Sequence, residues 1–135
     1  LDGANVEIHQ QVGGENMFLF GMTADEVEAL WRRGYNPREF LTPELEQVLR
    51  MLTSGILGQR YDDLVASLLT NRFGVADGFM TIADFKDYAR AQQDISNAYP
   101  NRLAFTAMSL TNIAKAGIFS ADRAVREYAE DIWHL

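Results

Sequence analysis

The chain contains two histidines, the side chain that most often performs acid–base chemistry near neutral pH. Neither His9 nor His134 has a second histidine or a carboxylate at a spacing typical of a metal or catalytic site. Glu7 and His9 are two residues apart, so their side chains diverge on a helix and share a face only on a strand. We therefore predict two surface histidines, with a Glu7–His9 acid–base dyad as the alternative.

Glycines near the N-terminus could cradle a phosphate through their backbone N–H groups. Gly3, Gly13 and Gly14 follow neither the G-x-G-x-x-G spacing nor the Walker spacing of phosphate-binding loops. Glycine readily adopts a left-handed backbone, so turn and helix-stop roles are the better prediction. Phosphate binding by these glycines is the weaker alternative.

Aromatic side chains are frequent in the second half of the chain and could form a stacking platform. Nucleic-acid platforms carry a basic stripe beside the rings, whereas this chain has 12 Lys and Arg against 19 Asp and Glu, a net charge of −7. We therefore expect no nucleic-acid partner. Packing in a core or interface is predicted for Tyr88, Tyr99, Phe105, Phe119, Tyr128 and Trp133.

The composition is that of one ordinary globular domain, with 135 residues, 47% hydrophobic and 23% charged. No apolar run approaches the roughly 20 residues needed to cross a bilayer, and the first residues lack a signal pattern. We expect a cytoplasmic protein without a membrane partner. Cysteine is absent, which excludes disulfides, thiolate metal sites and a cysteine nucleophile.

We expect helices to position the candidate residues named above, because apolar side chains recur at helical spacing along most of the chain. Thr23 to Glu26 form a capping box, Pro43 suits a first helical turn, and Gly34 and Pro100 end helices. The predicted helices begin near Val6, Thr23, Thr42, Asp62, Thr81, Leu103 and Ser120.

One strand is predicted, over residues 17–20. Four consecutive apolar residues from Met17 to Phe20, closed by Gly21, are typical of a strand buried on both faces of a parallel sheet. Such a strand needs neighbours that this chain does not supply. The chain also begins at Leu1 without an initiator methionine, so we expect it to be part of something larger.

The last predicted helix has clear capping and charge features and an unusual amino-acid sequence. Ser120 can cap it, Asp122 suits its positive end, and its sequence from Phe119 reads FSADRAVREYAEDIW. This stretch resembles the FSSDRTI-x-EYA-x-x-IW signature of the glycogen, starch and maltodextrin phosphorylases. Ala121 replaces the second serine, and Ala124-Val125 replace Thr-Ile, and both changes preserve the helix.

Further landmarks of that family occur in the family's order. DGANVE follows Leu1, GENMFLFGM begins at Gly14, GYN begins at Gly34, and NIA begins at Asn112. The resemblance therefore covers essentially the whole chain, residues 1–135.

The resemblance implies a fold and an activity for a parent enzyme. That family has two facing Rossmann-like domains and uses pyridoxal 5′-phosphate to transfer a glucosyl unit from α-1,4-glucan to phosphate. We expect residues 1–135 to be the C-terminal portion of the cofactor-bearing α/β domain, mainly helical with one or two short strands. Residues 120–135 would be its tail helix.

The family's cofactor lysine lies in a GTGNMK segment that this chain lacks. Lys86 and Lys115 are the only lysines, and neither has that context. Asp2 and Asn5 would follow the cofactor segment closely, yet short polar side chains at such a turn usually satisfy backbone N–H groups, and a ligand contact is the alternative. We therefore predict no catalytic, cofactor-binding or metal-binding residue, and no bound cofactor.

Two functional hypotheses follow. The first is an inert structural part of a phosphorylase, whose partner is the rest of the parent chain and whose parent alone binds glucan and phosphate. The second is a stand-alone helical module, derived from a phosphorylase, that binds a protein or a glucan. Under the first, exposed apolar surface should cause the excised chain to self-associate.

Overall fold

The computed structural model describes residues 3–135 and divides them into two units. One unit is Phe20–Gln92, and the other combines residues 3–19 with Gln93–Leu135. Each unit is described by itself. None of the helices among the described residues combines the length and hydrophobicity that crossing a membrane requires.

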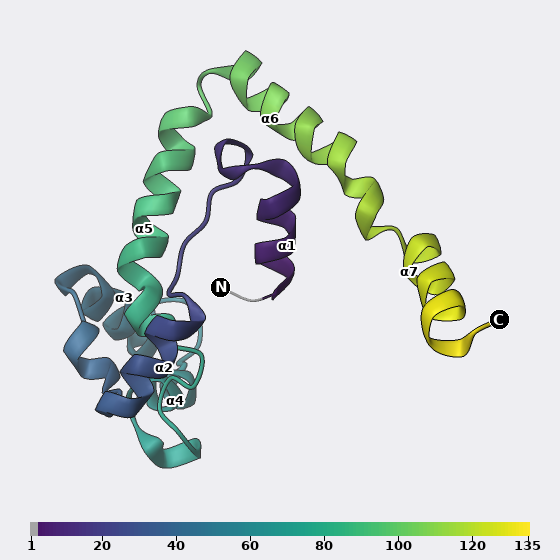
Figure 1. Ribbon diagram of the computed structural model, residues 1–135. Helices are drawn as coiled ribbons and strands as arrows, with labels where there is room; N and C mark the ends of the chain where they lie inside the picture. The colour runs from purple at the N-terminus through teal and green to yellow at the C-terminus, as the bar shows by residue number, and fades with distance from the viewer. Residues whose placement is uncertain (1–2) are drawn as a thin grey trace. The chain divides into compact units, whose positions relative to one another are not determined.

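The first unit is a set of short helices whose ends are fixed by local sequence (Figure 1). Thr23 and Glu26 form a reciprocal capping box at the start of α2, and Gly34 ends that helix at φ 91°. Thr42 accepts from the Leu45 N–H at 3.2 Å to cap α3. The elements are α2 (Ala24–Arg33), η2 (Pro37–Phe40), α3 (Pro43–Ser54), α4 (Asp62–Leu69), η3 (Asn71–Phe73) and the first part of α5 (Thr81–Ala98).

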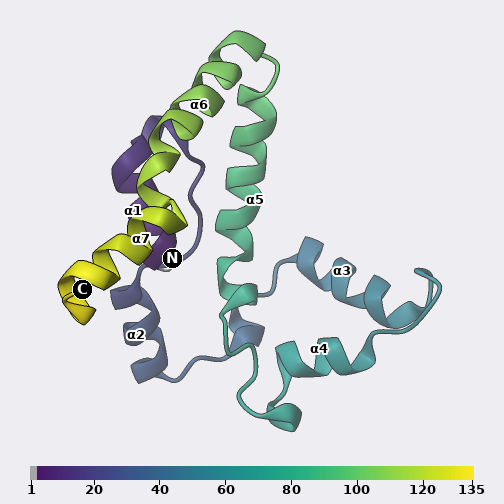
Figure 2. The same ribbon diagram turned by 90° about the vertical axis from the view of Figure 1, so that its right-hand side faces the viewer.

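The core of this unit lies between α3, α4 and the start of α5. Leu45, Leu49 and Ile82 are its buried side chains. Helices α3 and α4 pack against each other, as Figure 2 shows. Their partly buried neighbours in this core are Phe40, Leu41, Leu52, Val65, Leu68, Leu69 and Phe85.

The second unit is built on α6 (Arg102–Lys115), against which α1 (Gly3–Val12) and η1 (Gly14–Asn16) pack. The Asn112 side chain donates to the Asn16 carbonyl at 2.9 Å, and the rings of Phe18 and Phe105 lie 6.4 Å apart. The chain continues through η4 (Ala116–Phe119), α7 (Ala121–Glu127) and a wider π-type turn, η5 (Tyr128–Trp133).

The predicted strand at Met17–Phe20 is wrong, and with it the expected α/β Rossmann-like class. Residues 3–135 contain helices and connecting segments, with no strand and no sheet. Met17 does have extended backbone, φ −145° and ψ 138°. A strand needs a neighbouring strand to pair with its backbone, and the segment instead packs through side chains such as Phe18.

The seven predicted helices are confirmed, with ends within a few residues of expectation. Ser120 caps α7 as predicted by accepting from the Arg123 N–H at 3.3 Å. The widening of this helix after Glu127 has no signal in the sequence.

Candidate functional site

A buried carboxylate lies at the start of α5. Asp77 is 3% exposed, and its two oxygens accept from the N–H groups of Thr81 at 2.8 Å and Ile82 at 2.7 Å. The phenolic O–H of Tyr35 donates to the same carboxylate at 2.6 Å. Asp77 thus satisfies two N–H groups that a helix start leaves free, and it lies at the positive end of the helix dipole.

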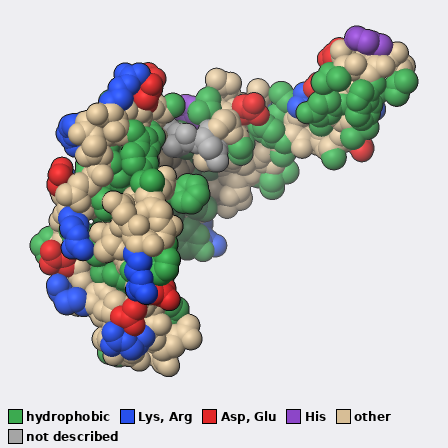
Figure 3. Space-filling model, turned by 90° about the horizontal axis from the view of Figure 1, so that it is seen from below, with side chains coloured by type: hydrophobic (Ala, Val, Ile, Leu, Met, Phe, Trp, Pro, Cys, Tyr) green, Lys and Arg blue, Asp and Glu red, His purple; other side chains and the backbone are tan. Residues whose placement is uncertain are grey.

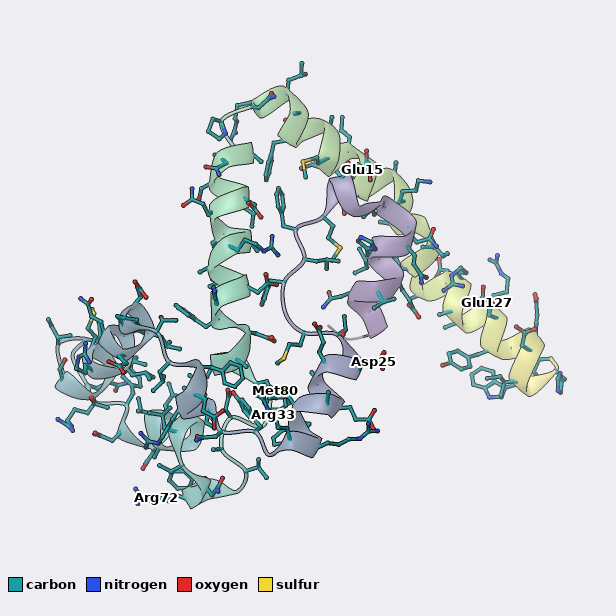
Figure 4. The ribbon with its side chains drawn as sticks, turned by 60° about the vertical axis from the view of Figure 1, so that its left-hand side comes forward. Glu15, Asp25, Arg33, Arg72, Met80 and Glu127 are labelled. Carbon is teal, nitrogen blue, oxygen red and sulfur yellow. The ribbon has the colours of Figure 1, made fainter. Side chains whose placement is uncertain are left out.

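The backbone around Asp77 is shaped to bring the carboxylate there. Asp77 has φ 46° and Met80 has φ 55°, in the left-handed region that aspartate tolerates better than most side chains. The Asp77 N–H donates to the Ser67 carbonyl at 3.0 Å, and its carbonyl accepts from Met80 at 2.8 Å. Met80, which Figure 4 labels, is itself buried, at 2% exposed.

Tyr35 acts here as a hydrogen-bond donor. Burial raises the pKa of its phenol above the ordinary value of 10.0, and the bond to Asp77 and the charge of Asp77 raise it further. The phenol therefore keeps its proton at neutral pH and cannot serve as a base. The pair holds α5 in place and offers no nucleophile.

A second pair of carboxylates on α5 holds the loop before α2. Asp87 accepts from the Gly21 N–H at 2.9 Å, and Asp84 accepts from the Met22 N–H at 3.0 Å. Arg90, 2.7 Å from Asp87, lowers the pKa of that carboxyl, and the Gly21 N–H lowers it further. Both carboxylates thus have structural partners.

Gly21 fits this loop for a geometric reason. Its φ is 94°, and a Cβ at this position would lie 2.9 Å from an oxygen of Asp84. Only glycine allows both the backbone conformation and the close approach.

Beside this loop lies an open hollow of about 450 Å³. Its walls are mainly aromatic, and the single carboxylate in it, Asp84, already binds the Met22 N–H. Phe79 at its edge is 95% exposed. The lining is Phe20, Phe79, Thr81, Asp84, Phe85 and Tyr88, which offers apolar contact and no acid–base pair.

The two histidines lie in different surroundings. His9 lies on α1 with its ring against Gly14, and Glu7 is exposed on the same helix, two residues away. Nδ1 of His134 lies 3.1 Å from the Glu130 carbonyl at the chain end. Within residues 3–135, no three His, Cys, Asp or Glu side chains gather in a way that could hold a metal.

The N-terminal glycines occupy helix ends. Gly13 stops α1 at φ 83° with its N–H bonded to the His9 carbonyl, which confirms its predicted helix-stop role. Gly3 begins α1 and Gly14 begins η1. Asn5 is half-buried on α1, and Asp2 lies outside the described residues.

Both lysines are exposed. Lys86 lies on α5 and lines an open groove that also contains the carboxylates of Glu39 and Asp87. Lys115 is the last residue of α6.

The aromatic side chains do not form one cluster. Tyr88 contacts Phe20, with ring centroids 5.1 Å apart. Tyr99 contacts Phe105 at 5.2 Å, and Tyr128 stacks on Trp133 at 6.2 Å. Phe119 lies in η4 and is partly exposed. Tyr128 and Trp133 are more than half exposed, so they are not part of a core, and for them the interface role stays a prediction.

Sequence reasoning missed the residues that the structure connects most closely, Tyr35, Asp77, Asp84 and Asp87. The spacing gave no capping signal, because Asp77 lies four residues before the helix start at Thr81, and it reaches that start only through the left-handed backbone at Asp77 and Met80. The Tyr35 contact spans 42 positions and has no local signal.

Comparisons with a protein family and with individual known proteins both identify phosphorylases as similar to this chain. The sequence matches the carbohydrate phosphorylase family over residues 1–135. It is 41% identical to human muscle glycogen phosphorylase over 135 aligned residues, 98% of this chain and 16% of that protein. It is 39% identical to the human liver form over 137 aligned residues, which cover 100% of this chain and 16% of that protein. The chain thus spans about one sixth of the length of these relatives.

Proposed function

The chain belongs to the carbohydrate phosphorylase family, and from this premise we propose that it is the C-terminal part of an enzyme that cleaves α-1,4-glucan with phosphate to release glucose 1-phosphate. The observation that carries the proposal is a match along the full 135 residues to proteins named glycogen phosphorylase. Residues 120–135 are the tail helix of that part.

The cofactor of the parent enzyme is pyridoxal 5′-phosphate, held by a lysine outside residues 1–135. The surroundings of Lys86 and Lys115 do not fit this group. Lys86 lies in an open groove with Glu39, Asp87 and Arg90, and Arg90 is already paired with Asp87 at 2.7 Å, so it is not free to hold the cofactor phosphate. Lys115 stands exposed at the C-terminal end of α6, where the negative end of the helix dipole disfavours a phosphate.

The role of residues 1–135 is structural. Asp77, Asp84 and Asp87 are the carboxylates that could be suspected of catalysis, and each already accepts backbone N–H bonds. A catalytic carboxylate must be available to the substrate. The three carboxylates instead hold α5 and the loop before α2. The contribution to the enzyme is therefore architecture.

The activity is tested on the longer polypeptide that joins residues 1–135 to the GTGNMK segment. With pyridoxal 5′-phosphate, glycogen and phosphate it should release glucose 1-phosphate. Failure with both glycogen and maltodextrin, in a folded and cofactor-loaded protein, would contradict the proposal.

The cofactor statement is tested on the 135-residue chain. After incubation with pyridoxal 5′-phosphate and reduction with borohydride, mass spectrometry should find no stoichiometric adduct. A saturable adduct on Lys86 or Lys115 would refute it. Retardation of the chain in a glycogen-containing gel would instead favour the stand-alone glucan-binding module.

A further inference from the structure

One hollow of the unit Phe20–Gln92 combines aromatic walls with a negative charge that its other lining residues do not balance. Asp84 is the only lining side chain that is charged at neutral pH, and its Oδ1 accepts the Met22 N–H at 3.0 Å. A carboxylate offers about four lone-pair sites, so this bond leaves its charge and most of its acceptor capacity in place. We call this space the aromatic hollow, and its lining is Phe20, Phe79, Thr81, Asp84, Phe85 and Tyr88.

The rings of the aromatic hollow add to its negative character. Phe20 and Tyr88 lie with ring centroids 5.1 Å apart and planes inclined by 70°, so they form two adjoining walls. Phe85 packs against the core of the unit, and Phe79 stands almost fully exposed at the edge. The face of an aromatic ring carries partial negative charge and attracts cations. Figure 3 shows that hydrophobic side chains reach the surface of the molecule among charged ones.

The volume of the aromatic hollow suits a small molecule. It measures about 450 Å³, within the range of roughly 300–1,000 Å³ that is usual for small-molecule sites. We propose that the aromatic hollow binds a small organic cation, whose alkylated ammonium group lies against the rings and near Asp84. Aromatic rings recognise quaternary ammonium groups through cation–π attraction, and the carboxylate adds a full opposite charge.

The charges of the aromatic hollow favour this occupant over other small molecules. An anion would meet both the Asp84 carboxylate and the negative faces of the rings. A neutral apolar ligand would cover Asp84 and remove its charge from water without providing a partner, which costs free energy. An alkylated ammonium group carries the complementary charge and an apolar surface together. The proposal concerns binding alone and does not depend on the phosphorylase activity of a parent enzyme.

Nuclear magnetic resonance titration of the 135-residue chain with benzyltrimethylammonium tests the proposal. The backbone N–H signals of Met22 and Thr81, which lie at the aromatic hollow, should shift saturably. Choline should also bind, and roughly threefold more tightly than the neutral alcohol in which a carbon atom replaces the choline nitrogen. Absence of a saturable shift at millimolar concentration, or equal binding of choline and the neutral alcohol, would overturn the proposal.

Two variants test the charge and the rings separately. Asp84→Asn removes the charge and keeps an acceptor oxygen for the Met22 N–H, and it should raise the Kd for benzyltrimethylammonium by roughly threefold or more. Glu44→Gln, at an exposed position of α3 outside the aromatic hollow, is its control and should leave the Kd unchanged.

Phe79→Ala removes a ring that is 95% exposed, so it should not disturb folding, and it should also raise the Kd. Phe73→Ala removes an exposed ring outside the aromatic hollow and is the matched control. Circular dichroism checks that each variant keeps its helices. An unchanged Kd in Phe79→Ala, or in a folded Asp84→Asn chain, would contradict the proposal.

Discussion

Asp77 has a buried carboxylate that accepts three hydrogen bonds, and its backbone is left-handed. Asp77→Asn replaces one acceptor oxygen with an NH₂ group that must face a donor. We expect a loss of about 2–3 kcal/mol in the free energy of unfolding, measured by urea denaturation. Asp25→Asn removes the same charge from an exposed position of α2 and should cost less than about 0.5 kcal/mol. Equal losses would show that the Asp77 contacts do not stabilise the fold.

Tyr35 gives the same contact a pH dependence. Folding raises the pKa of this phenol above 10.0, so its stabilising contribution is complete below about pH 10 and is lost as the pH rises through the folded pKa. The unfolding free energy of the wild-type chain should therefore fall more steeply above about pH 10 than that of Tyr35→Phe. Parallel curves for the two proteins would refute the assignment.

Gly21 links two elements, the loop before α2 and helix α5. Gly21→Ala must adopt an unfavourable φ and bring its Cβ against Asp84, whereas Gly34→Ala, with φ 91° and nothing within 4 Å, has only the backbone cost. We expect about 1–2 kcal/mol of destabilisation for Gly34→Ala and roughly 1 kcal/mol more for Gly21→Ala. Thermal unfolding of both variants measures the difference, and equal costs would mean that Asp84 moves aside.

The helices were predictable because their signals are local. Thr23 with Glu26, Pro43 and Ser120 act within one turn of themselves, and each does in the structure what its residue type indicates. The strand prediction at residues 17–20 failed because a strand must pair with a second strand, and an apolar run does not show whether a second strand is present. The contacts of Asp84 and Asp87 with the loop span more than sixty positions, so no local pattern could reveal them.

The whole chain should give a far-ultraviolet circular dichroism spectrum dominated by helix. Seven α-helices and their short extensions account for most of residues 3–135. A spectrum dominated by strand would contradict both the sequence pattern and the structure.

The central claim for the whole molecule is that the chemistry of a phosphorylase lies outside these 135 residues. The chain matches the family over residues 1–135, yet Asp77, Asp84 and Asp87 accept hydrogen bonds from its own backbone, and both lysines lie exposed. The most direct test is the release of glucose 1-phosphate by the purified chain from glycogen and phosphate, with excess pyridoxal 5′-phosphate. We predict no release above the protein-free control, and turnover proportional to chain concentration would contradict the claim.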